Sequence, residues 1–134
     1  MAATTETDIL IEFKKQLLTF FDELIDQFPQ EGDLVVLRLF ISNQIPIKDA
    51  MEAFNFKINT EEQMLRKMIK KRDESYFLDN NPFDSISKDK VSHFKKLWLS
   101  GSLDDEDKRI IWQWVDTFIF LGDKYMKAVG GGGR

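Results

Sequence analysis

The fold is decided by residues 102–129, SLDDEDKRIIWQWVDTFIFLGDKYMKAV, which combine a helix start signal with a very wide apolar face. Ser102 is the expected N-cap, with Asp105 as its capping-box partner, and residues 104–107 place acidic side chains at the positive end of the helix dipole. Large apolar residues then crowd the sequence: Ile110, Ile111, Trp112, Trp114, Val115, Phe118, Ile119, Phe120 and Leu121. Other helices must cover such a helix on more than one side. The stretch therefore predicts an all-α bundle built around it, with Trp112, Val115, Phe118 and Ile119 buried against the first two helices.

Length and composition agree with one helical domain. The chain has 134 residues, a usual size for one domain, and its 12 Phe and 3 Trp stand against only 7 Gly and 3 Pro. Large side chains with few turn formers favour helices over a sandwich or barrel. We expect about five to six helices within residues 7–129, a mobile stretch at residues 1–6, and a disordered glycine tail at residues 130–134.

The composition also excludes several classes of protein. The absence of Cys rules out a disulfide framework, thiolate zinc ligation and a cysteine nucleophile. No apolar run reaches the ~20 residues that a membrane-spanning helix needs, and the first residues lack the basic and apolar regions of a secretory signal. We therefore expect an intracellular protein without membrane insertion.

Apolar spacing and turn residues predict the helices before the C-terminal one. The first predicted helix runs from Thr7 or Asp8 to about Gln27, and the second is capped by Asp33 and broken at residues 43–46. The third begins at Pro46, and residues 55–59 form its end and the connection to the next helix. The fourth is opened by Thr60 and Gln63. Because the loop at Pro29 and Gly32 is short, the first two helices should be antiparallel neighbours.

The next segment, residues 73–87, has the turn signals of an irregular loop but is rich in aromatic residues. We expect Phe77 and Phe83 to dock it onto the bundle. A fifth helix should follow from Lys88 to Leu99, with Gly101 as its C-terminal cap.

Residues with the chemistry of an active site or metal site are scarce. His93 is the only histidine, so a hydrolase triad or a histidine-based metal site lacks a second member. The acidic run at residues 104–107 lacks the alternating spacing of a calcium loop. We therefore expect no catalytic residue, no cofactor and no metal, and a protein that is not an enzyme.

A basic cluster leaves an alternative function open. Five cations lie within seven residues: Arg66, Lys67, Lys70, Lys71 and Arg72. Together with the lysines of residues 88–96 they would suit a nucleic-acid-associated accessory protein, and Tyr76 and Phe77 could stack on bases. Against this, the net charge of −4 and the pI of about 5.0 oppose polyanion binding over the whole surface.

The leading hypothesis is a non-enzymatic protein-interaction or structural module. Phe20 with Phe21, and Trp112 with Trp114, are close neighbours in helices and should not all face inward. Surplus aromatic surface usually becomes an interface. We therefore expect a protein partner or self-association through these side chains.

Three blocks together resemble a known group of proteins. They are FFDELIDQFPQEGDLVVLRLFI at residues 20–41, YFLDN at residues 76–80, and LWLSGSLDDEDKRIIWQWVDTFIFLGDKY at residues 97–125. In this order they resemble short, uncharacterised, all-helical proteins of the nucleocytoplasmic large DNA viruses of algae and protists. The resemblance implies a helical bundle of viral origin, placed in the host cytoplasm or the virion, and brings no catalytic motif with it.

Overall fold

The computed structural model describes residues 5–83 and 88–131, and these residues form an all-helical domain without strands. The helices are α1 (Glu6–Gln27), α2 (Gly32–Asn43), α3 (Ile47–Asn59), the one-turn η1 (Glu61–Gln63), α4 (Met64–Lys70), α5 (Glu74–Asp79), α6 (Lys88–Leu99) and α7 (Asp105–Gly131). The predicted all-α single domain with a long C-terminal helix is confirmed.

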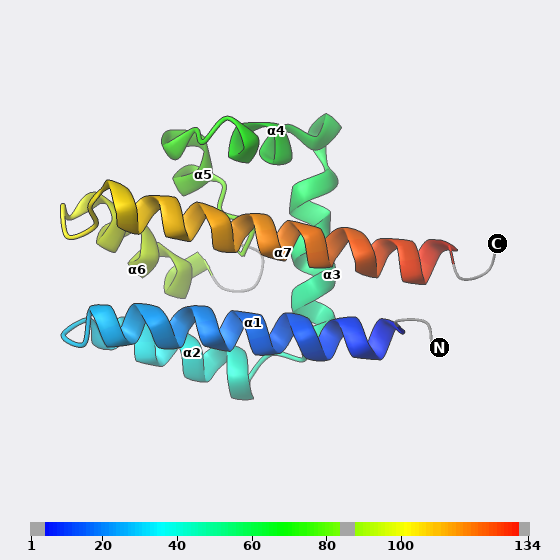
Figure 1. Ribbon diagram of the computed structural model, residues 1–134, viewed down its shortest axis with the longest axis horizontal. Coiled ribbons are helices and arrows are strands. Elements are labelled where there is room, and N and C mark those ends of the chain that lie inside the picture. Colours follow the sequence, from blue (N-terminus) through cyan, green and yellow to red (C-terminus); the bar gives the residue numbers. More distant parts are fainter. Residues whose placement is uncertain (1–4, 84–87, 132–134) are drawn as a thin grey trace.

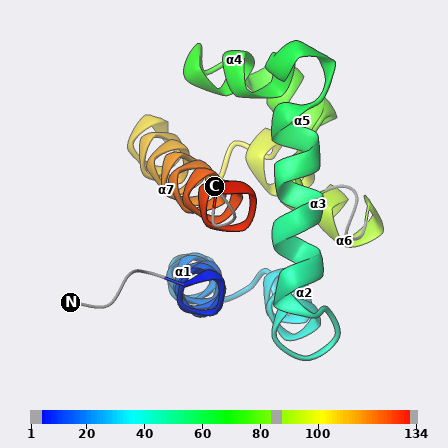
Figure 2. The ribbon, with the colours of Figure 1, turned by 90° about the vertical axis from the view of Figure 1, so that its right-hand side faces the viewer.

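The two long helices, α1 and α7, lie side by side and antiparallel (Figure 1). Helix α2 folds back along α1, as predicted from the short loop between them. Helix α3 runs crosswise to this layer, and Figure 2 shows it spanning the molecule from α2 at one end to α4 at the other. Helices α5 and α6 complete the bundle beside the first half of α7.

The core has two aromatic clusters, both centred on α7. In the first, the ring of Phe118 lies 6.0 Å from Phe13 and 5.7 Å from Phe20 of α1. In the second, the ring of Trp112 lies 4.9 Å from Phe77 of α5 and 5.6 Å from Trp98 of α6. Phe118, Val115 and Trp112 are buried as predicted, and Ile119 is half-buried. Trp112 differs from the prediction in its neighbours, because α5 and α6 cover it.

The starts of α1 and α7 differ from the prediction. The N-cap of α1 is Thr5, whose hydroxyl accepts from the backbone N–H of Asp8, so Thr7 and Asp8 lie inside the helix. The N-cap of α7 is Asp104, which accepts from the N–H of Asp107 at 2.8 Å, while Ser102 stays outside the helix. Leu103, which directly precedes this cap, is buried and anchors the chain there.

Helix α2 starts without a side-chain cap. Its N-cap residue is Glu31, and Asp33 lies within the first turn. The Asp33 carboxylate contacts His93 Nδ1 of α6 at 3.0 Å instead of capping the helix. The prediction that Asp33 caps α2 is therefore wrong, because a tertiary partner takes the carboxylate.

Three segments are more helical than predicted. Residues 55–59 continue α3 because Asn55 and Ile58 belong to its buried face. Within residues 73–87, Asp73 caps the short helix α5, so that part is not irregular. Phe77 is nevertheless buried, and Phe83 packs 5.2 Å from Phe54, so both dock this segment as expected. Of the tail, residues 130–131 still belong to α7, and residues 132–134 lie outside the described residues, as do residues 1–4.

Gly101 is in the left-handed region, with φ of 85°, two residues after the end of α6 at Leu99, as expected of a glycine that ends a helix. A second glycine is required for a different reason. At Gly122 of α7, a Cβ atom would lie 2.3 Å from Asn55 Oδ1 of α3. The absence of a side chain at this position lets α3 cross α7 closely.

Candidate interaction surfaces

The four aromatic residues predicted to form an interface are not an exposed surface. Phe20 and Phe21 are both buried, because α1 is packed against α7 on one side and α2 on another. The Phe20 ring lies 5.6 Å from Trp114, which is half-buried and donates from Nε1 to Glu23 at 3.3 Å. Trp112 is buried as well. The expectation that one residue of the pair Phe20 and Phe21 looks outward is therefore wrong.

A different apolar surface is exposed on α2. Val35, Val36 and Leu39 have exposed fractions of 40%, 53% and 50%. Leu39 follows Val36 by three residues and Val35 by four, so the three lie on one side of the helix, opposite the buried Leu34 and Leu37. We call Val35, Val36 and Leu39 the α2 face. An open groove of about 520 Å³ adjoins it at the C-terminal end of α2.

The α2 face is also free of charge. Helix α2 contains two ionisable residues, and both are turned toward neighbouring helices. Asp33 contacts His93 of α6, and Arg38 binds Asp22 of α1 with Nε 2.6 Å from Oδ1. Asp33 and Arg38 stay partly exposed but are each paired with a neighbouring helix, so the α2 face itself carries no charge. The sequence shows α2 to be apolar, but it does not show which of these residues lack a covering helix.

The arginines of the predicted basic cluster bind carboxylates of α7. Arg66 donates two hydrogen bonds to Asp123, at 2.9 and 2.8 Å, and Arg72 donates two to Asp116, at 3.0 and 2.7 Å. These hydrogen bonds raise the pKa of both guanidinium groups, against a smaller opposing effect of burial. Both arginines therefore tie α4 and its end to α7.

The three lysines of the cluster remain available. Lys67, Lys70 and Lys71 are exposed, and in the described part of the chain no carboxylate lies within ion-pair distance of them. Within the second predicted basic segment, residues 88–96, Lys95 binds Asp79 of α5 at 2.8 Å. The structure thus divides the predicted basic cluster into two structural arginines and three lysines that have no ion pair among the described residues.

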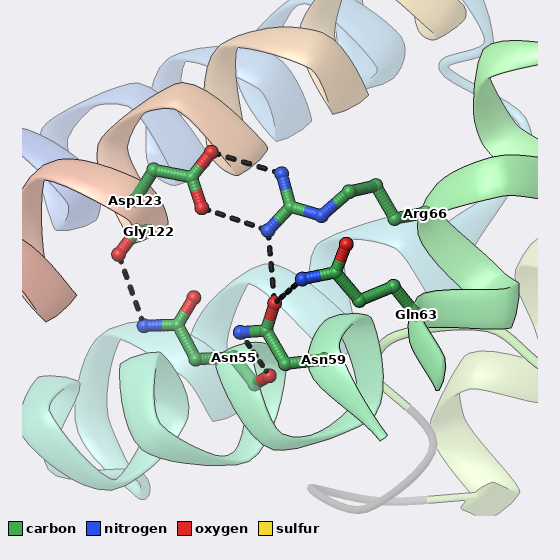
Figure 3. A network of polar contacts seen from close by, with 6 residues as sticks. All are labelled: Asn55, Asn59, Gln63, Arg66, Gly122 and Asp123. Atoms are coloured by element: carbon green, nitrogen blue, oxygen red, sulfur yellow. Dashed lines mark hydrogen bonds and ion pairs between the residues drawn. The ribbon is translucent and has the colours of Figure 1, made fainter. Parts of the chain in front are cut away.

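A polar network holds α4 against the α3–α7 crossing (Figure 3). Asn55 donates from Nδ2 to the Gly122 carbonyl at 3.2 Å, and Asn59 accepts from Arg66 Nη2 at 2.9 Å. Residues 61–63 all have positive φ, between 52° and 62°, and so reverse the chain between α3 and α4. Left-handed backbone costs roughly 1–2 kcal/mol for each such residue. The network on both sides of this turn offsets that cost.

An apolar cavity lies between α1, α2, α6 and α7. Its volume is about 40 Å³, and nearly all of its lining side chains are apolar. An apolar cavity of about 150 Å³ is large enough to bind benzene, so this one has no room for an organic ligand of that size. We regard it as an imperfection of the core packing.

The described residues include no group of three or more His, Asp or Glu side chains placed to hold a metal ion. A search of the same residues for helices long and apolar enough to cross a membrane finds none.

Comparison with known proteins found no matching family model, no matching curated protein and no matching solved structure. The resemblance to proteins of large DNA viruses stays a prediction.

Proposed function

We propose that the protein is a non-enzymatic interaction module that associates with a second copy of itself through the α2 face. The observation that supports this is the exposure of Val35, Val36 and Leu39 side by side on one helix. Exposed apolar residues scattered singly are normal on a surface, whereas contiguous ones mark interaction sites. We thus keep the hypothesis from the sequence that the protein associates through apolar side chains, but we place the contact on the α2 face and not on the four predicted aromatic residues.

The neutrality of the α2 face favours a second copy as the occupant. Two-fold dimers bring the same patch of both subunits together, so each patch must be complementary to itself. A charged patch would meet its own sign, but Asp33 and Arg38 are already paired with neighbouring helices of the same chain. Apolar side chains therefore meet apolar side chains without a buried unpaired charge.

The size of the face predicts a weak dimer. Helix α2 has 12 residues, which corresponds to a length of about 18 Å. Each side chain of the face is roughly half exposed, so burying the remainder contributes about 1 kcal/mol, or about 6 kcal/mol for both copies together. The cost of association, at least about 4 kcal/mol, offsets most of this gain. We therefore expect a very weak dimer, with a dissociation constant in the millimolar range or above.

Sedimentation equilibrium up to about 5 mM tests the proposal, because a dimer this weak forms measurably only at millimolar concentrations. The average mass of the wild-type protein should rise toward that of a dimer, and high salt should change this little. Leu39→Asp and Leu39→Lys should both remain monomeric, because each places an unpaired charge in the contact. Phe120→Asp is the matched control, since Phe120 is 62% exposed on α7 and should leave association unchanged.

A monomeric wild-type protein at the highest concentration would refute the proposal. Equal loss of association in Phe120→Asp and Leu39→Asp would also refute it, because the effect would not belong to α2. Far-ultraviolet circular dichroism of each variant checks that the helices are intact.

A further inference from the structure

Helix α4 lies at the other end of α3 from α2 (Figure 2), and Lys70 of α4 lines a groove there, with Lys67 and Lys71 close by in the sequence. The groove lies between α4 and α7 and has a volume of about 360 Å³. It is lined by Arg66, Ile69, Lys70, Arg72, Asp116 and Ile119. We infer that this groove binds an acidic segment of a protein partner, one in which carboxylates flank an apolar side chain.

Charge complementarity is the first reason for this ligand. The sequence from residue 64 to residue 72 contains five cations and no acidic residue. Asp116 and Asp123 neutralise the two arginines, which leaves a local excess of three positive charges on Lys67, Lys70 and Lys71. These exposed ammonium groups would attract a carboxylate-rich segment and set its orientation.

The structure of the groove supplies a second reason. Its lining includes Ile119, which is half-buried on α7 and still exposes apolar surface, beside the almost fully buried Ile69 of α4. An apolar side chain in contact with Ile119 would lose its exposure to water. The two arginine–aspartate pairs hold α4 in place beside α7, so the groove is formed before a ligand arrives.

The same observations favour a protein segment over a nucleic acid. Helix α4 has seven residues, about 10 Å in length, and a nucleic acid in contact with its three lysines would use only a few phosphates. Tight binding to duplex DNA commonly rests on about 6–10 phosphate contacts. Phe77 is buried against Trp112, so it does not offer a stacking surface to bases.

Isothermal titration with a synthetic probe peptide tests the inference. The probe is an acetylated eight-residue peptide with six glutamates around a central Leu-Phe pair, and its analogue has glutamine at those six positions. At low salt the glutamate peptide should bind about tenfold more tightly than the glutamine analogue. Lys70→Glu and Lys67→Glu should each weaken binding of the glutamate peptide about tenfold.

Two controls identify the surface responsible. Lys15→Glu makes the same charge change at an exposed position of α1 and should leave peptide affinity within about twofold of wild type, because distant charges are screened. Lys70→Glu should leave self-association through the α2 face unchanged. Failure of the groove and failure of the proposed dimer are thereby distinguishable.

Equal weakening by Lys15→Glu and Lys70→Glu would overturn the inference, because attraction to overall charge would then explain the binding. Tighter binding of a fifteen-nucleotide oligothymidine than of the peptide, with the same dependence on Lys70, would instead establish the nucleic-acid alternative. Glutamate and glutamine peptides of equal affinity would show that charge does not select the ligand.

Discussion

Replacing Gly122 by alanine should destabilise the protein, although alanine is the better helix former. In an exposed helix this change gains about 1 kcal/mol. Here the new Cβ would lie 2.3 Å from Asn55 Oδ1 and 3.3 Å from Asn55 Cγ, far inside van der Waals contact. Asn55 is only 5% exposed, so its side chain has little space to move into.

The magnitude follows from two destabilising contributions and one stabilising contribution. Overpacking of a core costs about 1–3 kcal/mol. Displacement of the Asn55 amide also removes its 3.2 Å hydrogen bond to the Gly122 carbonyl, worth about 1 kcal/mol. After subtraction of the gain in helix propensity, Gly122→Ala should lower the free energy of unfolding by about 1–3 kcal/mol.

A double-mutant cycle measured by urea unfolding isolates the cause. In an Asn55→Ala background the obstructing amide is absent, so Gly122→Ala should become neutral or stabilising by up to about 1 kcal/mol. The sign of the effect should therefore reverse between the two backgrounds. Two results would refute the close α3–α7 crossing described above. One is a Gly122→Ala variant with the same free energy of unfolding as wild type, and the other is an equal loss of stability from Gly122→Ala in both backgrounds.

Three further predictions concern the core, the start of α7 and the attachment of α4. Phe118→Ala should lower the free energy of unfolding by about 3–5 kcal/mol in urea titrations, because Phe118 is 1% exposed, and a loss below 1 kcal/mol would contradict its central position. The hydrogen bond from Gln27 lowers the pKa of Asp107 below its ordinary 3.8, so this ionised carboxylate stabilises the fold at neutral pH and that contribution is lost as pH falls through the lowered pKa. Asp107→Asn should then reduce stability at pH 7 but not at about pH 2, and an equal reduction at both values would exclude this linkage. Arg72→Gln should speed amide hydrogen exchange in α4 more than in α1, because it breaks the bidentate contact with Asp116, and uniform exchange would show that this contact does not hold α4.

The sequence predicted the helices well because apolar periodicity is a local property. Residues 105–129 contain enough large apolar side chains to identify α7 as the centre of the bundle without any tertiary information. The N-cap residues were predicted at the wrong positions because several polar residues near the start of a helix are able to cap it. Ser102 with Asp105 and Asp104 with Asp107 have the same spacing, and the burial of Leu103 favours the second pair.

The candidate surfaces were harder to predict because they depend on which sides of a helix receive neighbours. Adjacent residues on a helix point about 100° apart, so Phe20 and Phe21 are both buried once α1 packs between α7 and α2. Val36 and Leu39 of α2 are as apolar as its buried residues, and only the arrangement of helices leaves them exposed. Likewise, the carboxylates that bind Arg66 and Arg72 lie more than 40 positions away in the sequence.

The pairing of α1 with α7 also has a consequence for biosynthesis. Phe13 and Phe20 complete their ring contacts with Phe118, about a hundred residues later in the chain. A ribosome adds about 5–20 residues per second, so α1 waits on the order of 5–20 s before its main partner is made. During that time its apolar face is open to chaperones or to another nascent chain. Folding should therefore be slower than in helical proteins with mainly local contacts.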